Sequence, residues 1–228
     1  MDKPRIVIAS PHRRHDALER KLQEQLGWAV LRVRNPAELD PARLTAFAPC
    51  YVFFPHWSWK IPADVHEAFD CVIFHMTDLP FGRGGSPLQN LIARGVGDTQ
   101  LTALRCVAEL DAGPIYLKRP LSLLGTAEEI LMRAGQVAGE MIEHMVRHRP
   151  MPEPQVGEPT VFRRRTPEEG DLAQLDTLEK LFDHIRMLDA DGYPQAFLET
   201  THFKLEFTRA SLRPDGVIAD VKISRKKT

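Results

Sequence analysis

The chain has 228 residues, of which 43% are hydrophobic and 27% charged, a composition typical of a soluble globular protein. Its 30 basic and 31 acidic residues give a net charge of −1, which argues against a nucleic-acid partner, because nucleic-acid surfaces usually carry a basic excess that attracts phosphates. No apolar run approaches the ~18 residues that span a membrane, so no membrane partner is expected. The three widely spaced cysteines form neither a disulfide framework nor a metal site, which is typical of a cytoplasmic protein.

Short apolar runs alternate with helical patterns over the first 149 residues. Buried strands are predicted at residues 5–10, 28–33, 51–54 and 71–74. Two more strand-like runs are predicted at residues 101–107 and 114–117. Helices are predicted at residues 15–26, 41–47, 63–69, 87–93 and 127–148. Strands and helices that alternate at this spacing predict an α/β fold with an open, mainly parallel, Rossmann-like sheet.

The last third of the chain has a different pattern. Four prolines among residues 150–159 predict an extended linker. A helix near residues 177–188 and two strand-like runs, 202–208 and 217–223, which a Pro214-Asp215-Gly216 turn joins, predict a small α+β or all-β subdomain. The predicted organisation is a large domain at residues 1–149, a proline-rich linker at 150–160 and a small C-terminal subdomain at 161–228.

Three polar loops follow predicted strands, at residues 55–60, 75–85 and 109–113. In an open parallel sheet, ligands bind outside the carboxyl ends of the strands, so we expect these loops to meet there. His75 and Asp111, brought together in this way, could share proton-transfer work, with the carboxylate orienting the imidazole.

Other patterns carry less weight. The Gly82-Arg83-Gly84-Gly85 run is more typical of a tight turn than of a phosphate cradle, and no P-loop or GxSxG elbow is present. His144 and His148 are spaced as metal ligands, but no third ligand is spaced to join them, so no metal site is predicted. The run of arginines at 163–165 is more typical of a solvated face.

Two of the loops resemble signatures of one enzyme family. The sequence HMTDLPFGRGG at residues 75–85, with His75, the Leu79-Pro80 pair and the Arg83-Gly84 pair, resembles the first signature of the folate-dependent formyltransferases, and ELDAGPI at residues 109–115 resembles the second. The order of the two motifs and their separation also match the family. Residues 162–172 and 186–197 resemble the segments that lead into the small C-terminal domain of these enzymes, so the resemblance covers nearly the whole chain.

The resemblance implies a formyltransferase that uses 10-formyltetrahydrofolate as donor and no metal. His75 would manage the proton that leaves the acceptor amine, and Asp111 would hold the imidazole or a water. The donor would bind at the strand and loop near residues 51–61, and the residues expected to bind it are Phe54, Trp57, Ser58, Trp59, Lys60, Ile61 and Leu110. Asp78, Arg83 and Gly84 are the expected acceptor contacts.

The chain departs from the family at Ile73. Members usually have an asparagine two positions before the histidine, where it helps to bind the formyl oxygen, and an isoleucine has no donor. Another group would then have to stabilise the negative charge that forms on the formyl oxygen in the tetrahedral intermediate. The nearest candidates by sequence are His56, Thr77 and Lys60. The alternative is a protein that binds folate without efficient transfer.

The form of the first loop is most similar to that of formyltransferases that act on amino sugars of bacterial surface polysaccharides. It therefore implies a small-molecule amine acceptor, a nucleotide-linked amino-dideoxy sugar. Methionyl-tRNA enzymes of the family are longer and have a basic C-terminal domain, so a transfer RNA acceptor is not expected from this near-neutral chain. A formyltetrahydrofolate hydrolase and a catalytically weak folate-binding module stay open as alternatives, as does a homodimer.

Overall fold

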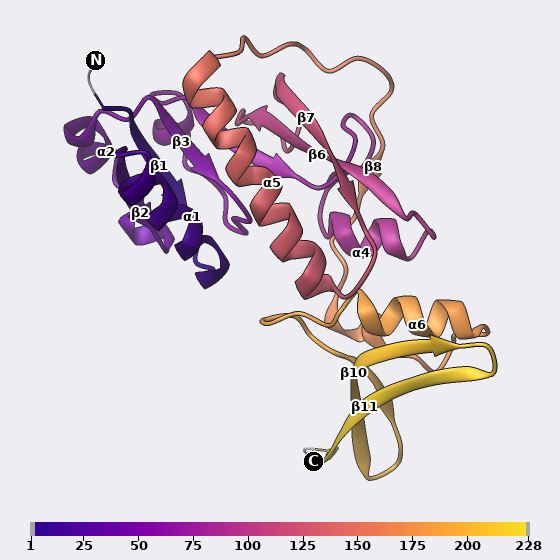
Figure 1. Cartoon of the computed structure of the whole chain (residues 1–228). Coiled ribbons are helices and arrows are strands. Elements are labelled where there is room, and N and C mark those ends of the chain that lie inside the picture. The colour runs from indigo at the N-terminus through magenta and orange to yellow at the C-terminus, as the bar shows by residue number, and fades with distance from the viewer. Residues whose placement is uncertain (1–2, 227–228) are drawn as a thin grey trace. The chain divides into compact units, whose positions relative to one another are not determined.

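A computed structural model describes residues 3–226, and its largest element is a six-stranded sheet with the order β2-β1-β3-β4-β6-β7 (Figure 1). Four strands are parallel: β1 (Arg5–Ala9), β2 (Ala29–Val33), β3 (Tyr51–Phe54) and β4 (Cys71–His75). Strand β6 (Asp98–Arg105) pairs with β4 in the antiparallel sense, and β7 (Ile115–Ser122) lies at the edge. The predicted α/β fold with a mainly parallel sheet is confirmed.

The helices of the first part of the chain are short, apart from α5. Helix α1 (Asp16–Arg20) runs on into a π-helical turn at Lys21–Gln25, and α2 (Pro41–Phe47), α3 (Ala63–His66) and α4 (Pro87–Ile92) follow in chain order. Helix α5 (Ala127–His148) has glycines at 135 and 139, where side chains of the α1 region approach it: a Cβ added to Gly135 would lie 3.3 Å from Cε1 of His15. An ion pair between Lys21 and Glu143 joins the same two segments.

The chain forms two compact units, each made of several segments of the sequence. The first comprises residues 1–83, 100–121 and 132–161, and the second comprises 84–99, 122–131 and 162–228. The segment predicted as a linker at residues 150–160 belongs to the first unit. The three-part domain organisation stays a prediction.

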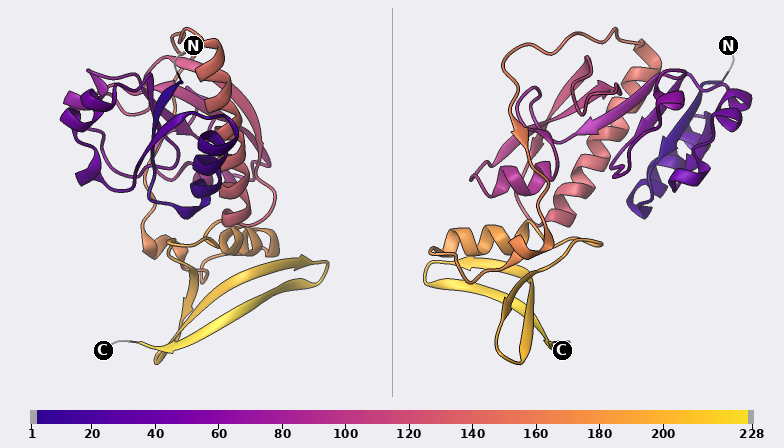
Figure 2. Two further views of the ribbon diagram at one scale, coloured as in Figure 1. Left: turned by 60° about the vertical axis from the view of Figure 1, so that its left-hand side comes forward. Right: turned by 180° about the vertical axis from the view of Figure 1, so that it is seen from behind.

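The second unit contains a three-stranded antiparallel sheet with the order β11-β10-β9. Its strands are β9 (Ala196–Glu199), β10 (Phe203–Arg213) and β11 (Gly216–Arg225), and β10 and β11 form a long hairpin (Figure 2). Helix α6 (Leu178–Arg186), which Thr177 caps through the amide of Lys180, packs on β10. The short strands β5 (Arg83–Gly84) and β8 (Val161–Phe162) pair with each other.

In the order β2-β1-β3, the chain first adds β2 on one side of β1 and then adds β3 on the other side. The place between β1 and β3 is therefore a topological switch point, where open α/β sheets bind ligands. The strands around this point are buried on both faces, with residues 6–9 of β1 and 52–53 of β3 at 0% exposure. Continuous apolar runs are what such buried strands require. Among residues 3–226, no helix is both long enough and apolar enough to span a bilayer.

Candidate functional site

His75 is the last residue of β4 and is 6% exposed. Its Nε2 lies 2.8 Å from the carbonyl oxygen of Gly82, a residue of the following loop with a φ of 74°. A carbonyl oxygen only accepts, so Nε2 carries the proton and donates it to Gly82. The loop therefore fixes the tautomer of His75 when the ring is neutral, with the lone pair on Nδ1.

Asp111 lies on the other side of the imidazole. Its Oδ2 is 3.6 Å from Nδ1 of His75, and Asp111 is 6% exposed. The residue has a φ of 52°, a left-handed conformation that costs a non-glycine residue about 1 kcal/mol or more and that persists where the surroundings hold it. A proton added at Nδ1 would face this carboxylate, so the pair is arranged to accept one proton.

Thr77 points into the interior of the loop. It is 0% exposed, its hydroxyl lies 3.5 Å from the Gly82 carbonyl oxygen, and its own carbonyl accepts a 2.7 Å hydrogen bond from Thr102. The structure therefore places Thr77 beside the partner of His75, as a support of the loop.

The three residues expected to contact the acceptor have different partners. Arg83 bonds to Gln155 and lies 3.3 Å from Glu109, whereas Asp78 is exposed and forms an ion pair with Lys118. Gly84 has a φ of 103°, and an added Cβ would collide with the carbonyl of Phe162, so this glycine is required for the approach of β8.

The loop after β3 presents aromatic rings. The ring centroids of Trp57 and Trp59 are 4.8 Å apart and edge-to-face, and Trp57 also packs on the buried Phe54. Trp57 Nε1 is buried and has no hydrogen-bond partner among the described residues. Ile61 is buried, and the remaining residues expected to bind the donor are exposed: Ser58, Trp59, Lys60 and Leu110.

His56 has a φ of 55°, and its ring packs on that of His12 with 4.2 Å between the centroids and a tilt of 35°. Burial lowers the pKa of His56 to about 3, and the nearby His12 and Arg14 act in the same direction. His56 is thus neutral at pH 7 and keeps one N–H as a donor.

Ile73 offers no substitute for the missing amide. It packs against the core cluster that contains Phe54 and Val65, and in the sheet it pairs with Phe54 on one side and Leu104 on the other. A side chain in this environment contributes packing and no hydrogen bond.

Lys118 and Thr160 hold the first loop, although nothing in the sequence singled them out. The Lys118 ammonium donates to the Leu79 carbonyl as well as to Asp78, and Thr160 Oγ1 accepts a 2.7 Å hydrogen bond from the Gly82 amide. Lys118 is an outward-facing residue of a strand and Thr160 follows a proline-rich segment, so neither has a local pattern that indicates a role.

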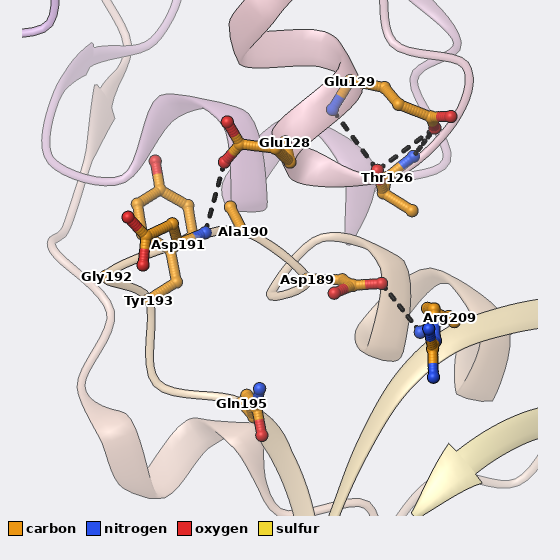
Figure 3. Close-up of a pocket in the computed structure, with 10 residues that line it drawn as sticks. All are labelled: Thr126, Glu128, Glu129, Asp189, Ala190, Asp191, Gly192, Tyr193, Gln195 and Arg209. Carbon is orange, nitrogen blue, oxygen red and sulfur yellow. Dashed lines mark hydrogen bonds between the residues drawn. The ribbon is translucent and has the colours of Figure 1, made fainter. Parts of the chain in front are cut away.

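A cavity of about 540 Å³ lies within the second unit (Figure 3). None of the predicted site residues lines it. Its carboxylates accept hydrogen bonds from the chain: Glu128 from the Asp191 amide, Asp189 from the Arg209 amide and Glu129 from Thr126. These bonds cap local turns and helix α5. Within residues 3–226, no group of three His, Cys, Asp or Glu residues is placed to hold a metal ion.

Comparisons with known proteins point to one family. A family model described as "Methionyl-tRNA formyltransferase, C-terminal domain" matches residues 167–224. The structure of a methionyl-tRNA formyltransferase from Clostridium thermocellum is 44% identical, with a TM-score of 0.94 over 98% of this chain and 100% of that one. A methionyl-tRNA formyltransferase of Gluconobacter oxydans is 26% identical over 90% of this chain and 70% of its own length. HypX from Aquifex aeolicus, in a complex with tetrahydrofolic acid, is 20% identical, with a TM-score of 0.71 over 92% of this chain and 38% of that one, and shows the same fold.

These findings correct two predictions. The amino-sugar acceptor and the exclusion of nucleic acid are wrong, because the relative at 44% identity and the matching family model are both methionyl-tRNA formyltransferases. A net charge sums over the whole chain, whereas binding of phosphates needs only a local excess of basic residues, so a total of −1 does not exclude nucleic acid. The resemblance of the paired loops to the formyltransferases is confirmed, and the chain belongs to the formyltransferase family.

Proposed function

We propose that the protein transfers a formyl group from 10-formyltetrahydrofolate to the α-amine of methionyl-tRNA. The observation that carries the proposal is the buried pair of His75 and Asp111, 3.6 Å apart, at the carboxyl end of β4. A pair built to take up one proton suits a reaction in which an attacking amine must lose one.

The loop at residues 55–61 suits a folate donor. Edge-to-face tryptophans give a flat ring an apolar wall, and the buried indole N–H of Trp57 is a donor that a polar ring system could satisfy. Trp57, Trp59 and the backbone of this loop would hold the donor, and Leu110, 67% exposed, would add apolar contact from the loop of Asp111. When bound, the donor supplies the formyl group.

The residues of the chain would then act on protons and position. Nδ1 of His75 accepts a proton from the acceptor amine as the amine nitrogen bonds to the formyl carbon. When the bond between the formyl carbon and the donor nitrogen breaks, Nδ1 gives the proton to that donor nitrogen. Nε2–H stays on the Gly82 carbonyl throughout, which keeps the ring orientation fixed. The carboxylate of Asp111 faces the new Nδ1–H and stabilises the positive charge while it exists.

The formyl oxygen needs donors other than residue 73. Because the Thr77 hydroxyl is directed at the Gly82 carbonyl, the loop after β3 is the better source, with the neutral His56 and the exposed Lys60 as donors. The left-handed backbone at His56 fits this role, since strained conformations concentrate at functional sites.

The hairpin of β10 and β11 supports a transfer RNA acceptor. Residues 203–226 contain six Lys or Arg and three Asp or Glu, an excess of three positive charges in a chain whose total is −1. Residues 203–224 of the hairpin lie inside the region that matches the C-terminal domain of methionyl-tRNA formyltransferases, and Arg225 and Lys226 follow it directly. Such a local excess attracts a phosphate backbone without sequence readout.

The test is an assay of the purified chain with 10-formyltetrahydrofolate and methionyl-tRNA, in which release of tetrahydrofolate and the mass of the released amino acid are both measured. We expect one formyl group on methionine and tetrahydrofolate release that requires the charged tRNA. Equal release with uncharged tRNA, or folate binding without turnover, would rule the proposal out.

A further inference from the structure

Residues 153–160 lie along both signature loops of the first unit, although their prolines suggest only a spacer. Glu153 exchanges two backbone hydrogen bonds with Ile115, at 2.7 and 2.8 Å, just beyond the loop of Asp111. Thr160 donates its amide to the Pro80 carbonyl at 3.3 Å and accepts the Arg83 amide at 3.0 Å. The segment is therefore bonded at one end to the second loop and at the other to the first.

Gln155 lies between these two ends and joins the loops with its side chain. Its Nε2 donates to the carbonyls of Asp111 and Gly113, both at 2.8 Å, and its Oε1 accepts from Nε and Nη2 of Arg83 at 3.1 and 2.9 Å. A glutamine amide has two donor hydrogens and two acceptor lone pairs, so all four are used. A side chain whose whole capacity is used in this way has one orientation.

The contacts fix both partners of the His75 imidazole. Gln155 holds the carbonyl of Asp111, whose left-handed backbone places the carboxylate against Nδ1. Thr160, in the same segment, holds the amide of Gly82, whose carbonyl accepts from Nε2. The Arg83 guanidinium, bonded to Oε1 of Gln155, ties the first loop to the second.

We propose that Gln155 is a positioning residue for the His75–Asp111 pair, and that residues 153–160 act as a strap that sets the distance between the two signature loops. The expected effect of Gln155 on kcat rests on the proposed formyl transfer. The expected structural effect, which is on the place of the Asp111 carboxylate beside Nδ1 of His75, does not rest on that function.

Two substitutions separate the contacts of Gln155. Gln155→Met keeps the length of the side chain and removes all four hydrogen bonds. Gln155→Glu keeps an acceptor for Arg83 but turns a carboxylate oxygen toward the carbonyls of Asp111 and Gly113, where two acceptors repel. Gln136→Met is the matched control, because Gln136 is exposed on α5.

The experiment compares these variants with the unaltered chain by kinetics and by ¹⁵N NMR of the histidine rings, with His75 assigned from a His75→Ala spectrum. In Gln155→Met we expect kcat to fall by about 10- to 100-fold, since a small misplacement of a catalytic pair has an effect of this size, while KM for the donor stays within about twofold. The Nδ1 resonance of His75, which the Asp111 carboxylate faces, should shift, while the proton stays on Nε2, which donates to the Gly82 carbonyl. Gln155→Glu should lose kcat as well, and Gln136→Met should lose none.

An unchanged kcat and an unchanged His75 spectrum in Gln155→Met would overturn the proposal, as would a loss of kcat that is explained entirely by unfolding in a thermal melt. If the unaltered chain shows no formyl transfer, the proposed function fails, but the His75 spectrum still decides whether Gln155 sets the pair.

Discussion

At the scale of single residues, His15 shows how burial sets a pH limit on stability. The side chain is 2% exposed beside Gly135 of α5, and neither ring nitrogen has a hydrogen-bond partner among the described residues. Burial lowers its pKa from 6.5 to about 3, and Arg32 and Arg14 add to the effect. The folded chain therefore holds this ring neutral at pH values where an unfolded chain would protonate it.

The sign of the effect follows from the direction of the shift. Well above pH 6.5 the ring is neutral in both states, so this group adds no pH dependence there. As pH falls from 6.5 toward 3, only the unfolded chain takes up the proton, and the free energy of unfolding falls by up to about 1.4 kcal/mol per pH unit. Between pH 6.5 and 5 this amounts to about 2 kcal/mol from His15.

We predict that His15→Leu reduces the acid-induced loss of stability, measured by urea unfolding at pH 6.5 and pH 5. The unaltered chain should lose about 2 kcal/mol more than the variant over this interval. His202→Gln, at an exposed position, serves as control and should behave as the unaltered chain. Equal losses in His15→Leu and in the unaltered chain would show that His15 does not carry the effect.

At the scale of elements, the loop that carries Asp111 depends on Gly113. A Cβ added at Gly113 would lie much closer to the Arg105 carbonyl oxygen, at the end of β6, than van der Waals contact allows. The neighbouring contact, a hydrogen bond from the Arg105 amide to the Pro114 carbonyl at 2.9 Å, fixes the backbone that would have to move. Position 113 must therefore be glycine, because the loop lies too close to the strand for a side chain.

Gly113→Ala is therefore expected to lower the free energy of unfolding by about 1–3 kcal/mol, as overpacking does, and to displace Asp111 from His75. Gly97→Ala is the control, because nothing lies within 4 Å of the added carbon there. The comparison is made by urea unfolding and by the formyl-transfer assay. A Gly113→Ala chain as stable and as active as Gly97→Ala would contradict the packing argument.

The strands around the site were predictable because they are buried on both faces and read as apolar runs. Residues 51–54 were expected as a strand and form β3, and residues 71–74 form all but the last residue of β4. The antiparallel direction of β6 was not predictable, since an apolar run carries no information about direction.

The candidate site was predictable only in part. His75 and Asp111 each follow a strand, so their meeting could be argued from the sheet alone, and the structure brings them together. Gln155 could not be found in this way, because a proline-rich composition indicates an extended chain and does not indicate which loops it lies against. The proposed transfer RNA acceptor was not expected from the sequence for a related reason: the total charge concealed the basic hairpin.

At the scale of the whole molecule, the charges of the hairpin should control affinity for transfer RNA and leave the chemistry alone. Arg213 and Arg225 are exposed at opposite ends of the hairpin. The double variant Arg213→Glu with Arg225→Glu should raise KM for methionyl-tRNA by about tenfold or more at moderate salt and flatten the salt dependence of binding, because fewer counterions are released.

Its kcat at saturating tRNA should stay unchanged. Arg20→Glu with Arg43→Glu, at exposed positions of the first unit, gives a control with the same change in net charge. If the control pair weakens tRNA binding as much as the hairpin pair does, the effect comes from total charge and the hairpin is not the binding surface.

The central claim is that His75 and Asp111 move the proton of the acceptor amine during formyl transfer. The most direct measurement is a single turnover, with enzyme in excess over methionyl-tRNA and saturating 10-formyltetrahydrofolate, followed by quench and mass analysis of the methionine. We expect rapid formation of N-formylmethionine by the unaltered chain, and rates lower by about 10²- to 10⁴-fold in folded His75→Gln and Asp111→Asn. Formylation at the unaltered rate in either variant would show that the pair does not move this proton.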